Sequence, residues 1–375
     1  MLLFIYTFFS FFLIWIVAER KLNIQFKYIV IFAFVLRIFV TFLFLISKSD
    51  DINTFIRDGR YLLTGSVKYE ASYFPFISYL GAAAVILKNY IHPYIFLKII
   101  FTIFDVLVLF PLYYLSKKNL QSALIYALNP ISIIVINIHG QMDSIPMFFF
   151  LTGLVLFLKN RILASILTIS FAIYTKPWPL LFILPLFKKT NNKILFIFLG
   201  IFPLLGTFIH SIFFAVPFSI ILGKVKDYRG IFGAWGLSKM AVYLLDYHLN
   251  PLVESAMRRV FLLSFFGFSY FQKEKDILRS VLISMLFLFV FSPTFGIQWF
   301  TWLVPFVVIV RPKLWRMFLV IGSIYLTFGF AWDVYQYFRD IMPLWNSVIT
   351  RVGFITWIFI IVMFFNNIKL TPQKR

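Results

Sequence analysis

The sequence predicts an all-α polytopic membrane protein, a bundle of about 13 transmembrane helices with further helices at the outer membrane interface. Three observations lead to this fold class. Hydrophobic residues make up 62% of the 375 residues, against roughly 45 to 50% in soluble domains. The apolar runs are long and lack the alternation of a membrane barrel, which favours helices over strands. The basic residues gather in short clusters between these runs.

Apolar runs that could cross a membrane recur along the whole chain. A span needs about 20 apolar residues, within a range of roughly 17 to 25, and several of these runs are short. The first run is expected to stay as a helix, because it lacks the basic region and cleavage site of a signal peptide. The expected spans are 2–18, 28–46, 94–115, 120–137, 144–158, 161–174, 178–187, 193–214, 257–271, 278–291, 297–310, 314–331 and 346–366.

The basic clusters set the expected orientation of the bundle. When the spans alternate, the clusters fall on one side, which the positive-inside rule makes cytoplasmic. Ten of the 14 carboxylates fall on the other side, so chemistry is expected on the non-cytoplasmic face of the cell membrane or the endoplasmic reticulum membrane. The clusters contain Arg20, Lys21, Lys27, Lys117, Lys118, Lys159, Arg161, Lys188, Lys189, Lys193, Lys273, Lys275, Arg279, Arg311, Lys313, Arg316, Lys369, Lys374 and Arg375.

Charge and missing motifs exclude several classes of function. A formal net charge of +21 would suggest nucleic-acid binding in a soluble protein, but these cations lie in short loops between spans, so no nucleic-acid partner is expected. The lack of cysteine removes disulfides, thiolate metal sites and cysteine nucleophiles. The sequence also lacks a Walker A loop, a GxGxxG dinucleotide unit and a zincin motif, which argues against an ATP-driven pump.

A polar segment, residues 49–75, opens the expected outer catalytic loop, 47–93. It contains four of the 14 carboxylates. Asp50 and Asp51 are candidates for a catalytic base, because a carboxylate beside a low-dielectric wall can take a proton from a sugar hydroxyl. Together with Ser49, they can equally cap the helix that follows. The two roles are compatible.

Two interfacial helices are expected within the outer loop. Residues 53–64 contain apolar pairs typical of an amphipathic interfacial segment, and Gly65 is expected to end that helix. Residues 73–93 are apolar enough to cross the membrane, but a crossing here would move Lys117 and Lys118 to the outer side. They are therefore placed on the outer interface.

A second polar constellation, His139, Gln141 and Asp143, lies on the outer side between two spans. A histidine and an aspartate four residues apart could bind a metal or a polyol. The alternative is that Asp143 or Ser144 caps the next helix.

Lys176 lies where two short spans meet, and Pro177 and Pro179 break the helix at that point. The carbonyls left unpaired by the break require protein or a water-filled cavity around them. A lysine in such a cavity could meet an anionic phosphate. The alternative is that Lys176 snorkels to the membrane interface.

Three arginines have different expected roles. Arg37 and Asp105 each lie near the middle of a span, where isolated charges are costly, so they are expected to form a structural pair. Arg351, near the outer end of the last span, is better placed to contact a ligand phosphate. Arg229 is a weaker candidate of the same kind, since exposed cations usually do nothing specific.

A late aromatic segment combines two kinds of residue. Gln298 is a polar amide that enters a span and needs a partner such as a sugar. On composition, its neighbours Trp299, Phe300 and Trp302 are expected to form an aromatic belt at the interface.

Glycines punctuate residues 215–256, which predicts a second outer segment in the form of a flexible polar loop or lid. The sequence shows no internal repeat and no soluble domain. Residues 1–375 are therefore expected to form a single integral membrane domain.

Taken in order, these motifs resemble the GT-C class of polytopic glycosyltransferases over residues 47–310. The closest likeness is to the family of catalytic subunits that add the first mannose in glycosylphosphatidylinositol assembly. By its spacing to Gly65, Asp51 corresponds best to the catalytic base of that family. The matching elements are Asp50 and Asp51, Gly65 to Tyr69, Tyr73 to Pro75, Asn129 and Pro130, Gly140 to Ser144, Lys176 to Pro179, and Gln298 to Trp302.

The resemblance implies a GT-C-like bundle and an inverting hexosyl transfer, with mannose as the favoured sugar. The donor would be a polyprenyl-phosphate-linked sugar such as dolichyl-phosphate mannose, and the acceptor a glycan or glycolipid. The donor phosphate would meet Lys176, Arg229 or Arg351. Such enzymes imply no cofactor and no essential metal, and a small membrane subunit is a possible partner. The alternative is a transporter or lipid-linked sugar flippase.

Overall fold

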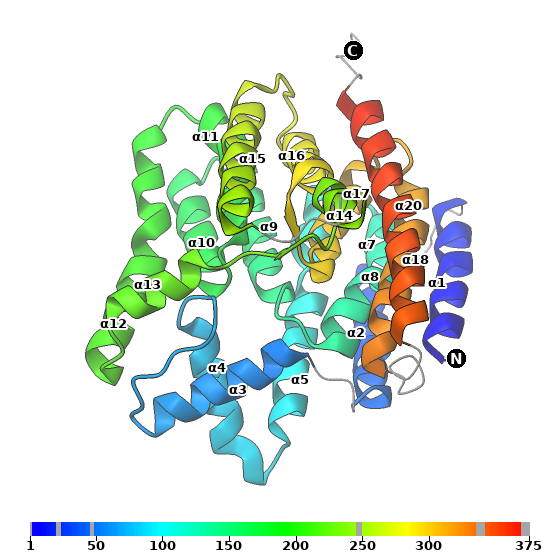
Figure 1. The fold of residues 1–375 in the computed structure, drawn as a ribbon. Coiled ribbons are helices and arrows are strands. Elements are labelled where there is room, and N and C mark those ends of the chain that lie inside the picture. Colours follow the sequence, from blue (N-terminus) through cyan, green and yellow to red (C-terminus); the bar gives the residue numbers. More distant parts are fainter. Residues whose placement is uncertain (1, 20–23, 46–48, 245–249, 335–341, 369–375) are drawn as a thin grey trace.

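The chain folds as an all-α membrane protein whose helices form a bundle with two distinct ends (Figure 1). The computed structural model describes residues 2–19, 24–45, 49–244, 250–334 and 342–368. The chain is a multi-pass membrane protein, while the count of about 13 crossings stays a prediction. Within the described residues, the helical stretches long and apolar enough to cross a membrane are Phe26–Leu43, Pro93–Leu115, Leu120–His139, Lys193–Phe214 and Ser347–Ile368.

Helices account for nearly all of the regular structure. The α helices are α1 (Leu2–Glu19), α2 (Phe26–Leu43), α3 (Asp50–Leu63), α4 (Phe76–Ile86), α5 (Pro93–Leu107), α6 (Leu109–Leu115), α7 (Leu120–Leu128), α8 (Pro130–Ser132), α9 (Ser144–Leu158), α10 (Ile162–Thr175), α11 (Leu184–Lys189), α12 (Ile201–Phe214), α13 (Phe218–Lys226), α14 (Gly236–Leu244), α15 (Pro251–Phe271), α16 (Ile277–Phe291), α17 (Phe300–Val310), α18 (Trp315–Val334) and α20 (Met342–Ile368). The other elements are the 3-10 helices η1 (Leu87–Asn89), η3 (Trp178–Phe182), η4 (Lys193–Gly200) and η5 (Ile297–Trp299), the π helix η2 (Ile133–His139), and the strands β1 (Ile231–Phe232) and β2 (Thr294–Phe295).

Most expected spans coincide with one helix or with consecutive helices, because long apolar runs can satisfy their backbone groups only within a helix. Residues 178–187 are the exception. Prolines interrupt the α-helical hydrogen bonding there, so the backbone forms the 3-10 helix η3 and then the short helix α11. Lys176 is extended between α10 and this break.

Helix α3 lies across the lower end of the bundle in Figure 1. The Ser49 side chain caps it by accepting the backbone N–H of Ile52 at 3.1 Å. Gly65 follows its end in the left-handed conformation, with φ +66°. The helix expected over 53–64 is therefore present and begins three residues earlier, at Asp50. Its place at a membrane interface stays a prediction.

Two glycines let α3 and α4 cross at backbone contact. A Cβ on Gly59 would lie 2.2 Å from the Gly81 carbonyl carbon, and a Cβ on Gly81 would meet the Phe55 carbonyl oxygen. Any side chain at either position would force the helices apart. This crossing holds the middle of α3 against α4.

The expected loop or lid over 215–256 is wrong for the described residues, because most of them are helical. They form α13, α14 and the start of α15, with β1 between α13 and α14. Strand β1 pairs antiparallel with β2. Trp235 is buried and donates its indole N–H to the Phe289 carbonyl at 2.7 Å. Burial of this large ring offsets the glycine and charge content that suggested a loop.

The buried pair Arg37–Asp105 is confirmed. The Arg37 Nε lies 2.6 Å from Asp105 Oδ2, and both side chains are essentially inaccessible. Arg37 also donates to the Ala127 and Tyr126 carbonyls, at 2.8 and 3.2 Å. The pair therefore ties α2 and α5 to the end of α7.

Basic clusters from distant parts of the chain meet at one end of the bundle, the upper end in Figure 1, which we call the basic end. Contacts there join α18 to α1, α11 to the α15–α16 turn, and α16 to α20. Helix α3 lies at the opposite end. This arrangement agrees with the expected sidedness, although which end faces the cytoplasm stays a prediction. The joining pairs are Arg316 with Glu19, Lys188 with the Gln272 carbonyl, and Arg279 with the Asn367 carbonyl.

Candidate functional site

Asp51 is held by two side chains from distant parts of the chain. One of its carboxylate oxygens, Oδ2, accepts a hydrogen bond from Gln141 Nε2 at 2.8 Å and another from the Tyr73 hydroxyl at 3.3 Å. Asp51 is half-buried in the first turn of α3. Its other oxygen, Oδ1, has no partner among the described residues. The carboxylate is therefore oriented through one oxygen and open at the other.

The position of Gln141 follows from an unusual helix end. The π helix η2 is terminated by Gly140, which is left-handed with φ +87°. Glycine is favoured here because L side chains rarely adopt this φ, and because a Cβ would also lie 2.3 Å from Ile52 Cδ1 of α3. Gln141 follows directly and so meets Asp51. Single π turns are frequent at functional sites.

Asp143 forms a buried ion pair with Lys176. The Lys176 Nζ lies 2.8 Å from Asp143 Oδ2, and neither side chain is accessible to solvent. The other oxygen, Oδ1, accepts the indole N–H of Trp302 at 2.7 Å. Lys176 reaches this position because α10 ends at Thr175 and the proline break leaves the lysine extended.

Tyr73 connects the two carboxylates. Its hydroxyl binds Asp51, and its ring centroid lies 5.0 Å from Lys176 Nζ, within the range of a cation–π contact. Parallel indole rings pack behind the pair: Trp302 stacks on Trp178 at 4.8 Å and on Trp299 at 5.0 Å. We call Asp51, Tyr73, Gln141, Asp143, Lys176 and Trp302 the Asp51–Asp143 cluster.

Two tyrosine hydroxyls at the cluster remain protonated. Burial, followed by the nearby Asp51 carboxylate, raises the pKa of Tyr73 well above its ordinary value. Burial, followed by Asp143 and Asp51, also raises the pKa of Tyr228, whose ring lies 5.5 Å from that of Tyr73. The Tyr73 hydroxyl donates its proton to Asp51, whereas the Tyr228 hydroxyl has no hydrogen-bond partner among the described residues and can donate to an anionic or sugar oxygen at neutral pH.

The loop that carries Tyr73 is tied to α3 through Asp58. The two Asp58 carboxylate oxygens accept the backbone N–H groups of Glu70 and Ala71, both at 2.9 Å. Burial raises the Asp58 pKa to about 6, although these two hydrogen bonds act in the opposite direction. The Tyr69 hydroxyl adds a bond to the Tyr73 carbonyl at 2.6 Å. Helix α3 therefore positions both Asp51 and the residue that orients it.

Three buried polar atoms beside the cluster have no hydrogen-bond partner in the part of the chain that the structure describes. They are Gln141 Oε1, Trp178 Nε1 and the Tyr228 hydroxyl oxygen. Unpaired buried polar atoms are uncommon, because each carries a desolvation cost of about 1 to 3 kcal/mol. One acceptor, Gln141 Oε1, and two donors, Trp178 Nε1 and the Tyr228 hydroxyl, are thus available to a polar ligand beside Asp51 and Asp143.

The remaining predicted site residues have other surroundings. Asp50 is exposed, and within the described residues its carboxylate makes no hydrogen bond. The His139 ring packs on Phe330, at 4.3 Å between centroids. Gln298 is half-buried beside Gly296. Arg351 is exposed on α20, and no contact of the described residues joins it to Asp51 or Asp143.

Arg229 is exposed but adjacent in sequence to Tyr228, which contacts Tyr73. The pairing of β1 with β2 fixes the backbone just beyond it, from Ile231. Arg229 is therefore linked to the cluster through its neighbour Tyr228, whose ring contacts Tyr73. No described contact links the other exposed cation, Arg351, in this way.

Three alternative interpretations of the sequence are wrong. Asp143 does not cap α9 through its side chain, because its carboxylate is used by Lys176 and Trp302. Lys176 does not snorkel, since it is completely buried. Trp299, Phe300 and Trp302 are not an interfacial belt, because all three are buried in the bundle.

Tyr73 and Tyr228 were not identified as site residues from the sequence. Tyr73 had a usable signal, because it begins a Tyr-x-Pro element just before an apolar helix, and it faces Asp51 only through the loop held by Asp58. Tyr228 had none, since its role depends on how residues 227–230 pack against distant segments.

The cluster combines a half-exposed carboxylate with an open oxygen, hydroxyl donors and a buried ammonium group, which suits proton removal from a hydroxyl and binding of polar ligands. No three His, Asp or Glu side chains of the described residues gather closely enough to hold a metal ion. Comparisons with protein families, curated proteins and solved structures find no match to this chain.

Proposed function

We propose that the chain is a membrane glycosyltransferase, most simply a mannosyltransferase. It would move a hexose from a polyprenyl-phosphate donor, such as dolichyl-phosphate mannose, to a lipid-linked or surface glycan acceptor. The supporting observation is the convergence of Asp51 and Asp143 on one cluster at the end opposite the basic end. Inverting sugar transfer needs a base beside polar hydrogen-bond donors, and the Asp51–Asp143 cluster and its neighbour Tyr228 supply both.

In the proposed reaction, Asp51 takes the proton from an acceptor hydroxyl. The freed oxygen attacks C1 of the donor sugar, the C1–O bond to phosphate breaks, and its electron pair leaves with the polyprenyl phosphate. One displacement inverts the configuration at C1. Gln141 and Tyr73 bind the same oxygen of Asp51, so the open Oδ1 can receive the proton without loss of these contacts.

The charges near the cluster suggest where the donor phosphate binds. Lys176 is neutralised by Asp143 at 2.8 Å, so it contributes less net positive charge than a free lysine. Arg229 is exposed and follows Tyr228, whose protonated hydroxyl can also donate. We therefore assign the phosphate to Arg229 and Tyr228. The buried Lys176–Asp143 pair would hold the side chains around the site in place.

The test is formation of product by the purified protein in detergent. Labelled polyprenyl-phosphate mannose and glucose are each incubated with candidate glycolipid acceptors, and products are separated and their anomeric configuration determined. We expect a glycosylated acceptor of inverted configuration from a polyprenyl-phosphate donor, and none from the matched nucleotide sugar. Transfer from the nucleotide sugar alone, or retention of configuration, would contradict the proposal.

A transporter or lipid-linked sugar flippase without transferase activity is the second candidate. One observation favours it: the buried Lys176–Asp143 pair lies beside a broken helix, a combination that membrane transporters also use. The same preparation distinguishes the two functions. Product formed in detergent needs no second compartment, so it would exclude a function in transport alone. Movement of labelled lipid across a liposome bilayer without any glycosylated product would support the transporter or flippase.

A further inference from the structure

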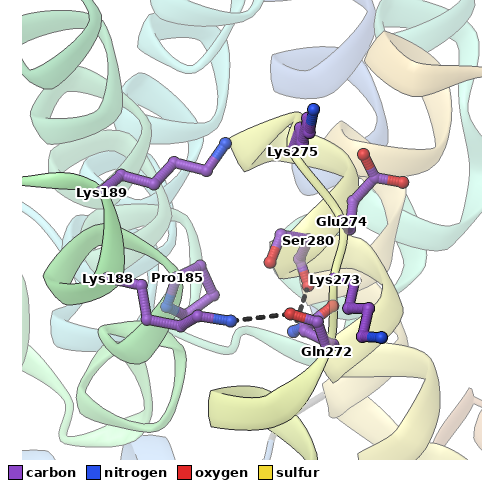
Figure 2. Close-up of a pocket in the computed structure, with 8 residues that line it drawn as sticks. All are labelled: Pro185, Lys188, Lys189, Gln272, Lys273, Glu274, Lys275 and Ser280. Atoms are coloured by element: carbon purple, nitrogen blue, oxygen red, sulfur yellow. Dashed lines mark hydrogen bonds between the residues drawn. The ribbon is translucent and has the colours of Figure 1, made fainter. Parts of the chain in front are cut away.

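A strongly cationic pocket lies at the basic end, far from the Asp51–Asp143 cluster. It has a volume of about 410 Å³ and lies between α11 and the turn that joins α15 to α16 (Figure 2). Its lining includes four lysines and one glutamate, the four being Lys188, Lys189, Lys273 and Lys275. We call it the lysine pocket.

The lysine pocket is built from segments that are distant in sequence. Lys188 Nζ donates to the Gln272 carbonyl at 2.7 Å, which ties α11 to the α15–α16 turn. Figure 2 shows this bond, and shows Lys189 reaching from α11 toward the side of the turn that carries Lys275. The cations therefore surround a space between two elements instead of lying along one exposed loop.

The acidic residues near the lysine pocket are already committed to other partners. Glu274 Oε2 pairs with Arg279 Nε at 3.0 Å, and its Oε1 accepts the Asp276 N–H at 2.9 Å. Asp276 caps α16 by accepting the Arg279 N–H at 2.8 Å. In the described part of the chain, none of the four lysines forms an ion pair. Four lysines against one lining glutamate leave a net positive potential, which favours an anion, although Glu274 and Asp276 also act on Lys189.

An apolar surface leads into the lysine pocket. Along α15, Val260, Leu263 and Phe271 are exposed by 63, 76 and 77%, and their spacing places them along one side of the helix. Phe271 immediately precedes Gln272 in the pocket lining. In a membrane protein, such a surface suits acyl chains. A ligand with a charged head and apolar tails fits both features at once.

We propose that the lysine pocket binds the phosphate group of an anionic phospholipid, whose acyl chains lie along the exposed side of α15. Basic pockets between helices on the cytoplasmic side are suited to anionic headgroups, and lysine binds phosphate as a point charge. The proposal is independent of the proposed catalytic function, because it uses none of the cluster residues. Lipid bound here would link α11 to α15 and α16.

Native mass spectrometry of the full chain in detergent tests the proposal. The protein is titrated with phosphatidylglycerol and, separately, with phosphatidylcholine of the same chain length. We expect tighter binding of phosphatidylglycerol by the wild-type protein. The triple variant Lys188→Gln, Lys189→Gln, Lys275→Gln is expected to bind phosphatidylglycerol about 10- to 100-fold more weakly, because each removed lysine weakens attraction to anionic lipid.

A matched variant controls for net charge. Lys117→Gln, Lys118→Gln and Lys159→Gln remove three exposed lysines of the expected cytoplasmic side that do not line the pocket. Phosphatidylglycerol binding by this variant is expected to change by less than about threefold. The single change Lys275→Gln, in the exposed turn, is expected to weaken phosphatidylglycerol binding less than the triple variant does. It leaves the hydrogen bond from Lys188 to the Gln272 carbonyl intact.

Three results would overturn the proposal. The first is an equal loss of phosphatidylglycerol binding in both triple variants, and the second is equal wild-type binding of the two lipids. The third is displacement of the lipid by pyrophosphate at similar concentration, which would identify a soluble phosphate as the ligand. Thermal unfolding midpoints close to wild type verify that each variant is folded.

Discussion

Two ion pairs are buried in the same bundle, but their surroundings differ. In the Arg37–Asp105 pair, every nitrogen of the guanidinium group has a partner, and Asp105 accepts a second bond from the Tyr126 hydroxyl at 2.5 Å. In the Lys176–Asp143 pair, the ammonium group makes one hydrogen bond within the described residues, although it can donate three. Among the described residues, the first pair thus uses four of five guanidinium donors, whereas the second uses one of three ammonium donors.

This difference separates a structural pair from a functional one. A buried network in which most donors have partners fixes a fold, whereas a buried pair with two unused donors has capacity for a ligand. Lys176–Asp143 also lies beside Asp51, which keeps one oxygen open, and beside unpaired polar atoms of Gln141 and Trp178. We therefore expect changes at the two pairs to affect stability alike and activity differently.

The largest expected effect on stability comes from removing one partner of either pair. Arg37→Met or Lys176→Met leaves a buried carboxylate without its counter-charge, which costs about 3 to 5 kcal/mol. The midpoint of thermal unfolding in detergent should fall for both variants. It should fall further for Arg37→Met, because this change also removes the hydrogen bonds to the Ala127 and Tyr126 carbonyls. An unchanged midpoint for Arg37→Met would contradict a structural role.

Neutralising both partners separates stability from activity. Lys176→Met with Asp143→Asn should recover most of the stability, since replacing a buried pair by neutral groups is often close to neutral. Sugar transfer should nevertheless stay at least about 100-fold below wild type, because polar groups at the site are lost. The matched control is Arg37→Met with Asp105→Asn, which should keep its transfer rate per folded molecule. Equal activity in the two double variants would remove the distinction between the pairs.

Asp58 is expected to have an effect between those of the buried ion pairs and those of exposed residues. Its buried carboxylate accepts hydrogen bonds from two backbone N–H groups. Its pKa of about 6 exceeds the ordinary 3.8, so the folded state binds this proton more tightly than the unfolded state. Its contribution to stability is therefore greatest below about pH 4 and is lost as the pH rises through about 6. Relative to Asp58→Asn, the wild-type unfolding midpoint should fall across this range. A constant difference from pH 4 to 7 would contradict the burial argument.

The smallest effect is expected at an exposed pair. Arg57 and Glu70 lie 2.9 Å apart with 48 and 37% of their side chains exposed. Arg57→Gln should cost about 0 to 1 kcal/mol, because water and salt screen such pairs. A larger fall of the unfolding midpoint would mean that this pair, and not Asp58, holds the loop that carries Tyr73.

Sequence patterns predicted the features that depend on local composition or on depth in the membrane. The helices follow from long apolar runs, the capping of α3 from Ser49, and the Arg37–Asp105 pair from the cost of isolated charges in a span, whereas the start expected for α3 was three residues too late. The same patterns gave Asp51, Gln141, Asp143 and Lys176 as candidates.

Patterns could not show how the candidates pair. The contact between Gln141 and Asp51 depends on the left-handed Gly140 after a π helix, which no apolar period encodes. The burial of Lys176 depends on Trp302, more than a hundred residues later. Residues 215–256 have the composition of a loop, but the described residues among them form α13, α14 and the start of α15, and Trp235 packs against α16. Long-range packing decided each of these outcomes.

The comparison of two adjacent aspartates tests the central claim most directly. Asp51 belongs to the Asp51–Asp143 cluster, whereas Asp50, one residue earlier, is exposed and makes no such contact. Single-turnover sugar transfer is measured for Asp51→Asn and Asp50→Asn, each verified as folded by its unfolding midpoint. We expect Asp51→Asn to lower the rate by about 100- to 10,000-fold, and Asp50→Asn to stay within about threefold of wild type. Wild-type transfer by folded Asp51→Asn, or an equal loss in both variants, would contradict the assignment of this cluster as the site.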